Sequence, residues 1–288
     1  MNALLDIWRF RRLLWDLVRQ DFRSRYAGSV IGVFWNVVQP AAQVFIFAVL
    51  LARIIGSRLP DSMRMQEIDD PYALSIYICA GLLPWIVFNE TIMRTSTTFL
   101  AHSNLIKKVA FPHPLLVLYQ VISGLFTLAI MCLLLLLVAL ATGHRIGLSI
   151  VWLPVLILLQ GVFTYGLGLL LATITAHFRD MPQIIGIVLQ LWFWLTPIVY
   201  ARDLMNVLAP WGIGPVLLRI NPLYHFTNLY QNILFKHVVY FDFLPNALVP
   251  PTDQFTAKLV LISALGLALV AAATLFYAKL RHELPDQI

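Results

Sequence analysis

Glu90 and Arg94 stand inside a long apolar stretch of the sequence, and among the side chains there they are best equipped for polar chemistry. Their i, i+4 spacing places them on one face of a helix, with the acid first, which is the favoured order. Charges inside a membrane are costly and usually face a bundle interior or a wet cavity. Two interpretations stay open: a self-neutralising pair near the end of a span, or the polar lining of a pathway.

Motifs for catalysis are absent from the sequence. It contains no Walker A motif to cradle a nucleotide phosphate, and neither an H-E-x-x-H motif nor a Cys/His cluster. Cys79 and Cys132 lie in separate apolar stretches without a CxxC partner, so neither a disulfide framework nor a metal site is predicted. We therefore expect no catalytic residue, metal or cofactor on this chain.

The composition is that of a membrane protein. Hydrophobic residues make up 60% and charged residues 12%, against about 45–50% and about 25% in soluble domains. The net charge of +6 is spread unevenly, because arginines crowd the first 25 residues and acids crowd residues 61–70. This pattern indicates membrane orientation rather than nucleic-acid binding.

Residues 3–27 predict an amphipathic helix at the membrane surface. Apolar residues recur at helical spacing, with arginines largely on the opposite side. Tryptophan on the apolar face and arginine on the polar face suit a helix in the lipid interface, although a helix packed on another domain would look similar. The residues assigned to this interface helix are Trp8, Trp15, Arg19, Asp21, Phe22, Arg25 and Tyr26.

Six spans follow, since a helix needs roughly 20 apolar residues to cross a bilayer. Residues 201–256 are broken by Pro and Gly into pieces too short to span, and we expect short re-entrant or interfacial helices there, on the outer side. The expected fold is an all-α membrane protein with one transmembrane domain over residues 1–288, its six-span bundle covering residues 30–280. The spans are expected at residues 30–52, 72–99, 115–141, 150–176, 184–200 and 259–280.

The distribution of Lys and Arg predicts that both termini are cytoplasmic. With that orientation eleven of these residues lie inside and eight outside, with Arg94 unassigned. The excess agrees with the positive-inside rule, and the N-terminal cluster strengthens it because the first helix usually dominates.

The segment 104–114, between the second and third spans, is amphipathic, carries Lys107 and Lys108, and ends in prolines. Lysines are favoured at cytoplasmic span ends, so we place this segment inside the cell. It is either a connector or a surface on which another protein pushes.

The fifth span is rich in aromatic residues. Trp192 and Trp194 lie two positions apart, about 200° around a helix, so at most one of them faces lipid. An aromatic belt at the outer boundary is one interpretation. Aromatic faces in a wet lumen, where they suit the C–H faces of sugars, are the other.

Several segments together resemble the membrane subunit of type-2 ATP-binding-cassette exporters that move polysaccharides, namely the permeases of O-antigen, capsule and teichoic-acid export. They occur in the family's order and cover most of the chain, although the outer region around residues 242–254 is longer than the family pattern. The matching segments are residues 18–40, 80–85, 104–112, 178–180, 196–200 and 221–223.

The resemblance implies a homodimer with a channel between its subunits, in the bacterial inner membrane, above a separate ATPase dimer that holds ATP and Mg. It implies a lipid-linked polysaccharide such as O-antigen lipopolysaccharide or capsule as substrate. The ATPase-coupling residues are then Leu105, Ile106, Lys107, Lys108, Phe111, Arg179 and Asp180. The expected channel-lining residues are Trp85, Phe88, Glu90, Arg94, Trp192, Trp194 and Tyr200.

Other functions remain open at this point. A type-2 exporter of teichoic acid, a lipid or a drug would share the same plan. A membrane-embedded glycosyltransferase or acyltransferase would need a carboxylate or histidine cluster, and no paired carboxylates accompany His102, His113 and His177. A passive channel would need no ATPase, so co-purification with an ATPase separates it from an exporter.

Overall fold

A computed structural model of the chain describes residues 9–25, 32–50, 72–108, 111–143, 148–199, 213–234, 252–281 and 283–284. All regular structure in these ranges is helical, which confirms the predicted all-α class. Short helical turns η1 (Gly32–Phe34), η2 (Ile46–Leu50, a π-helix) and η3 (Leu148–Trp152) adjoin the longer elements. The α-helices are α2 (Arg11–Ser24), α3 (Trp35–Phe45), α5 (Ala73–Ser96), α6 (Thr98–Ala101), α7 (Ser103–Lys108), α8 (Pro114–Ala141), α9 (Leu153–His177), α10 (Met181–Trp194), α12 (Ile213–Ile220), α13 (Pro222–Leu234) and α14 (Thr252–Leu280).

Four helical stretches are long and apolar enough to cross a membrane: Ser75–Ser96, Pro114–Ala141, Ser149–His177 and Phe255–Leu280. Two shorter apolar stretches, Trp35–Val49 and Met181–Trp194, correspond to the first and fifth expected spans. The first of these holds Pro40 within α3 and continues as the π-helical turn η2, so its backbone departs from a regular α-helix.

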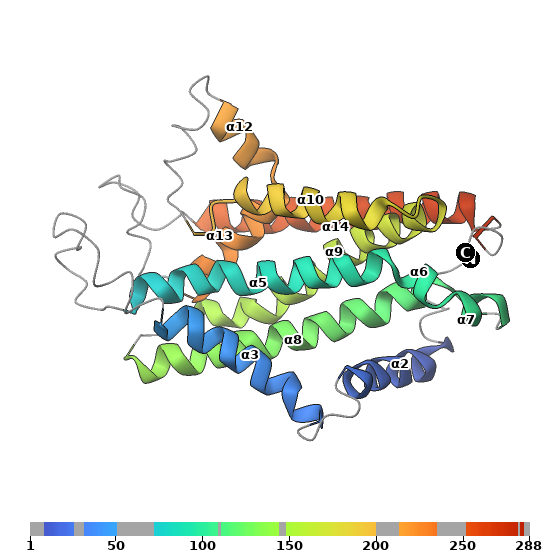
Figure 1. Ribbon diagram of the computed structural model, residues 1–288. Coiled ribbons are helices and arrows are strands. Elements are labelled where there is room, and N and C mark those ends of the chain that lie inside the picture. The colour runs from blue at the N-terminus through green and yellow to red at the C-terminus, as the bar shows by residue number, and fades with distance from the viewer. Residues whose placement is uncertain are drawn as a thin grey trace.

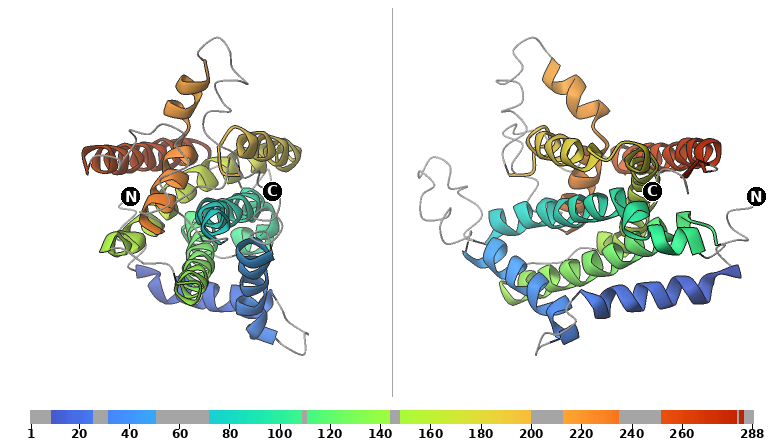
Figure 2. Two further views of the ribbon diagram at one scale, coloured as in Figure 1. Left: turned by 90° about the vertical axis from the view of Figure 1, so that its left-hand side faces the viewer. Right: turned by 45° about the vertical axis from the view of Figure 1, so that its right-hand side comes forward.

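The long helices run side by side, with α5 near the centre of the bundle (Figures 1 and 2). In its apolar stretch 72% is buried, against 17% in that of α14, which lies at the edge of the bundle. In the end-on view, α3 and α10 flank α5 on one side and α9 and α14 lie on the other (Figure 2). α5 therefore packs inside the bundle, where it contacts α8, α9, α10 and α13.

Small residues let these helices approach closely, as is common in membranes. A Cβ atom on Gly166 of α9 would lie 2.8 Å from the backbone nitrogen of Val270 on α14. A Cβ atom on Gly124 of α8 would lie 2.4 Å from the hydroxyl of Thr91 on α5. The helix spacing in the core therefore depends on these glycines.

The last span begins earlier than expected. α14 begins at Thr252, before the apolar stretch that predicted a start at residue 259, because each residue added to an existing helix gains a backbone hydrogen bond whether its side chain is polar or apolar. Between α10 and α14 the structure describes α12 and α13, and α13 is buried against α5, α9 and α14. The rest of the expected outer region, residues 201–212 and 235–251, lies outside the described residues.

Candidate functional site

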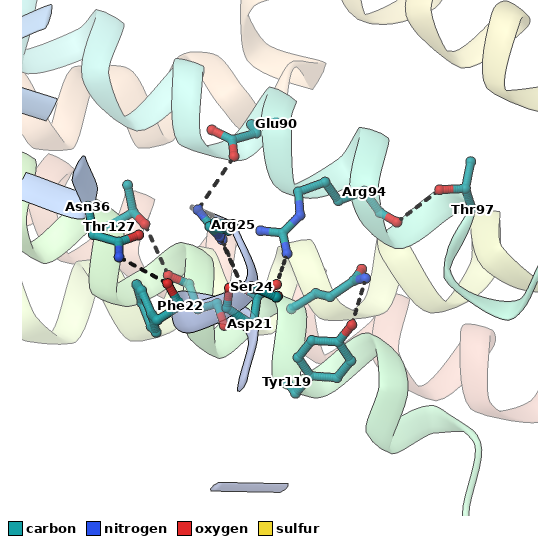
Figure 3. A network of polar contacts seen from close by, with 12 residues as sticks. Asp21, Phe22, Ser24, Arg25, Asn36, Glu90, Arg94, Thr97, Tyr119 and Thr127 are labelled. Carbon is teal, nitrogen blue, oxygen red and sulfur yellow. Dashed lines mark hydrogen bonds and ion pairs between the residues drawn. The ribbon is translucent and has the colours of Figure 1, made fainter. Parts of the chain in front are cut away.

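A cluster of four charged side chains links the C-terminal end of α2 to α5 (Figure 3). Its members are Asp21, Arg25, Glu90 and Arg94. The carboxylate of Asp21 accepts hydrogen bonds from Arg94 of α5 and, at 3.1 Å, from Arg25 just after α2. The other side of Arg25 lies 3.7 Å from the carboxylate of Glu90. Glu90 and Arg94 each reach α2, so their main partners lie across the bundle.

The network has as many cations as anions, because two arginines face an aspartate and a glutamate. The Asp21 side chain is only 9% exposed, and those of Arg25 and Arg94 are 18% and 27% exposed. Partly buried charges are tolerated when they are paired and hydrogen-bonded. The cluster therefore fixes α2 on the bundle without leaving a net charge near the membrane.

Polar contacts continue from this cluster toward the loop before α7. The Tyr119 hydroxyl lies 3.3 Å from His102 Nε2, and the Gln120 amide donates to the same hydroxyl at 3.2 Å. On the other side, the Asn36 amide of α3 donates to the Phe22 carbonyl at 3.2 Å. Beside the charged cluster, one hydrogen bond thus links α2 to α3, and another contact links α8 to the residue before α7.

The apolar face of α2 meets protein rather than lipid alone. Leu14 and Val18 are buried in a cluster with α8 and α9 side chains. Trp15 and Phe22 make edge contacts with Phe126 of α8, with ring centroids 6.0 and 6.1 Å apart, while Trp15 stays half exposed. Of the other assigned residues, Arg19 is exposed, and Trp8 and Tyr26 lie outside the described residues.

The expected coupling segment forms α7, at the end of the bundle where α9 stops and α10 begins (Figure 1). Lys107 and Lys108 are exposed and Leu105 is half-buried. Ile106 and Phe111, however, are buried in the chain's own core in this structure. A helical pattern shows which residues share a face, but not which neighbour covers that face.

The turn between α9 and α10 places further charges at the same end. Arg179 and Asp180 are exposed there. Nearby, His113 precedes α8, and its Nδ1 lies 3.1 Å from the Tyr277 hydroxyl of α14. Burial lowers the pKa of His113 below its ordinary value. The end of the bundle that carries α7 therefore combines exposed charged side chains with a partly buried histidine, His113.

Most of the expected channel aromatics form a cluster inside the chain's own helix bundle. Trp85 and Phe88 are buried, and their rings lie 5.6 Å from Phe193 and 5.9 Å from Trp192 respectively. Trp192 also donates a hydrogen bond to Asn221 at 2.8 Å. Phe88 at 1% exposure has no open face in this conformation, so packing accounts for it better than channel lining.

Trp194 differs from Trp192, as their spacing predicts. Its side chain is 57% exposed, although its ring meets Phe193. Tyr200 lies outside the described residues. Among the residues that the structure describes, no group of three or more His, Cys, Asp or Glu side chains is placed to hold a metal ion.

Comparison with known proteins identifies the family of the chain. The family model for ABC-2 type transporters matches residues 12–235. The O-antigen export system permease protein RfbA of Myxococcus xanthus is 26% identical over 288 residues, which is 100% of each chain. A Klebsiella pneumoniae protein of the same name is 25% identical over 236 residues, covering 81% of this chain and 83% of the relative.

A second Klebsiella pneumoniae protein of that name is 26% identical over 213 residues, covering 73% of this chain and 75% of the relative. The family model matches most of the chain, which confirms the family resemblance found in the sequence motifs. The chain therefore belongs to the ABC-2 type transporter family, as a multi-pass membrane permease whose matched domain is not an ATPase and which works with an ATPase partner.

Proposed function

We propose that the chain is the channel-forming subunit of an ATP-driven exporter that moves lipid-linked polysaccharide, similar to O-antigen, out of the cytoplasm. The observation that carries this proposal is the full-length match to a permease named for O-antigen export. The relatives from Klebsiella carry the same name over most of their length. We place the protein in the bacterial inner membrane as a homodimer.

The coupling surface in this proposal is the exposed face of α7 together with the turn at Arg179 and Asp180. Both lie at one end of the bundle, near the end of α14 (Figure 1). Lys107 and Lys108 expose their charges there, whereas Ile106 holds α7 on the bundle. Such a helix can transmit movement, since its inner face is fixed to the permease and its outer face is free for the ATPase. This end is then cytoplasmic, as are both termini.

The channel in this proposal passes along the side of α5 that carries Glu90. The Glu90 side chain is 48% exposed although it belongs to a membrane-spanning stretch, and exposed charges in such stretches usually face water or a second protein surface. α3 and α10 flank α5 on one side (Figure 2). A second protomer facing that side would enclose a polar path between the two copies.

An exporter of teichoic acid, a lipid or a drug is the second candidate, because it would use the same fold and the same coupling surface. The aromatic side chains of α10, with Trp194 exposed, favour a glycan because sugar rings present C–H faces to aromatic rings. A neutral polymer that must slide needs contacts that are individually weak.

Deletion of the gene in its own host tests this function. We expect surface polysaccharide to disappear and lipid-linked glycan to accumulate in the cytoplasm, with recovery when the gene is returned on a plasmid. Unchanged surface polysaccharide, together with an altered drug sensitivity or lipid distribution, would favour the second candidate instead.

A further inference from the structure

A polar cavity lies between the end of α2 and helices α3, α5 and α8. Its volume is about 220 Å³, whereas one water occupies about 30 Å³ in the liquid, so it holds more than a single bridging water. Two of its lining residues, Arg25 and Glu90, belong to the charged cluster drawn in Figure 3. The residues that line it are Arg25, Asn36, Gln39, Pro40, Gln43, Glu90, Thr127 and Met131.

Amide side chains of the first span dominate this lining. Asn36, Gln39 and Gln43 follow an i, i+3, i+7 spacing, which puts all three on one helix face toward the cavity. The Gln43 Oε1 atom is buried with no hydrogen-bond partner among the described residues. A buried acceptor without a partner costs about 1–3 kcal/mol, so this position favours a ligand that donates a hydrogen bond.

The charges at the cavity argue against an anionic ligand. Arg25 is held by Asp21 at 3.0 Å and lies 3.7 Å from Glu90. Phosphate sites usually present cations or backbone amides whose charge is not already neutralised. A phosphate here would also meet the Glu90 carboxylate, which repels it.

A ligand with hydroxyl groups fits the same lining. Each hydroxyl both donates and accepts, and amides offer the matching acceptor and donor on one side chain. Glu90 accepts, and the Thr127 hydroxyl, which donates to the Ser123 carbonyl at 3.2 Å, can accept as well. The cavity lies between the end of α2 and the first span, so with the orientation proposed above such a ligand would lie beside the interface helix.

We propose that this cavity receives one sugar residue of the exported glycan at the start of transport, held by Gln39, Gln43 and Glu90. The inference rests on the proposed polysaccharide export, and it adds a recognition site that is separate from the aromatic residues of α10. It assigns sugar selectivity to α3, whereas the aromatic faces accept any pyranose.

Leucine substitutions in the host strain provide the first arm of the test. We expect Gln39→Leu and Gln43→Leu to lower surface glycan per molecule of permease about five-fold, as the loss of one or two neutral hydrogen bonds would. Gln20→Leu is the matched control, because Gln20 is exposed on α2 and does not line the cavity. Immunoblots of the permease normalise surface glycan for the abundance of each variant.

Photo-cross-linking provides the second arm. A benzoylphenylalanine at position 39 is irradiated in cells that make the glycan and in cells blocked in its synthesis. We expect a high-mass adduct, detected with a lectin or an anti-glycan serum, in the glycan-producing cells alone. An adduct of lipid mass that mass spectrometry finds equally in both strains, without a glycan signal, identifies a lipid headgroup in the cavity and overturns the proposal.

Two other results also overturn it. Wild-type export by both leucine variants would show that the amides do not bind the substrate. Absence of a glycan adduct would overturn it even if those variants export poorly, since their defect would then come from altered packing. A failure of the proposed function looks different, because surface glycan would then be independent of the permease altogether.

Discussion

Replacing Asp21 by Asn should detach α2 from α5. The Asp21 carboxylate holds both Arg94 and Arg25, and its side chain is only 9% exposed. Loss of one partner costs about 3–5 kcal/mol for a buried ion pair and about 0–1 kcal/mol for an exposed one. The side chains of Arg25 and Arg94 are 18% and 27% exposed, so these ion pairs lie between the two limits. We therefore expect Asp21→Asn to cost about 2 kcal/mol of docking free energy.

That free energy corresponds to an about 30-fold fall in the ratio of docked to detached α2, since about 1.4 kcal/mol is tenfold. Spin labels at exposed Arg12 of α2 and exposed Ala129 of α8 report the two populations as separate distances. The labelled protein carries alanine at the buried thiols, Cys79 and Cys132. The measurement is made on the permease with its ATPase in lipid nanodiscs.

Asp16→Asn is the matched control, because Asp16 is an exposed carboxylate on the same helix, and it should leave the distances unchanged. The double variant Asp21→Asn/Arg94→Met should recover roughly half of the lost free energy, because no unpaired charge then remains on α5. A wild-type distance distribution for Asp21→Asn would refute the argument that this ion pair holds α2. Equal effects of Asp16→Asn and Asp21→Asn would refute it as well.

Three further outcomes are expected. The double variant Lys107→Glu/Lys108→Glu should uncouple ATP hydrolysis from export while the permease keeps its normal abundance. Ile106→Ser should instead lower abundance, because Ile106 is buried. Unchanged export in the charge variant would contradict the coupling surface. Trp194→Ala should reduce export per molecule and Trp192→Ala should mainly reduce protein level, since Trp192 bonds Asn221 inside the protomer; the opposite pattern would refute this division. Burial holds the pKa of His113 below its ordinary 6.5. The contribution of His113 to folding stability should therefore be fully present above pH 6.5 and be lost at lower pH, because the unfolded chain binds the proton more readily. Thermal melting at about pH 7.5 and about pH 5.5 should show a smaller drop for His113→Gln than for wild type, and an equal drop would contradict this role.

The local sequence pattern was sufficient to predict where the long helices lie, but it did not predict which side chains pair between helices. The apolar stretches predicted the positions of the long helices because about 20 apolar residues are needed to cross a bilayer. The i, i+4 spacing of Glu90 and Arg94 suggested a pair within one helix, yet Arg94 binds Asp21, which is 73 residues away in the chain. Spacing along a helix determines a face, but tertiary packing determines which charge meets it.

The coupling segment and the aromatic residues show the same limit. The amphipathic pattern of residues 104–111 predicted a surface helix, and α7 covers Ser103–Lys108, but the side chains of Ile106 and Phe111 belong to the core of the chain. The spacing of Trp192 and Trp194 separated a packed ring from an exposed one, without indicating which was which. The polar face of α3 was present in the sequence as the spacing of Asn36, Gln39 and Gln43, and an inspection of polar periodicity within spans would have found it.

Reconstitution tests the central claim most directly. The permease and its ATPase are placed in proteoliposomes with lipid-linked glycan, and the glycan that becomes accessible to an impermeant lectin on the opposite side is measured after addition of ATP. The account predicts glycan transfer that requires ATP, the ATPase and the permease together. Transfer without ATP would indicate a passive channel, and ATP hydrolysis without any glycan transfer, with a drug or lipid moved instead, would contradict polysaccharide export.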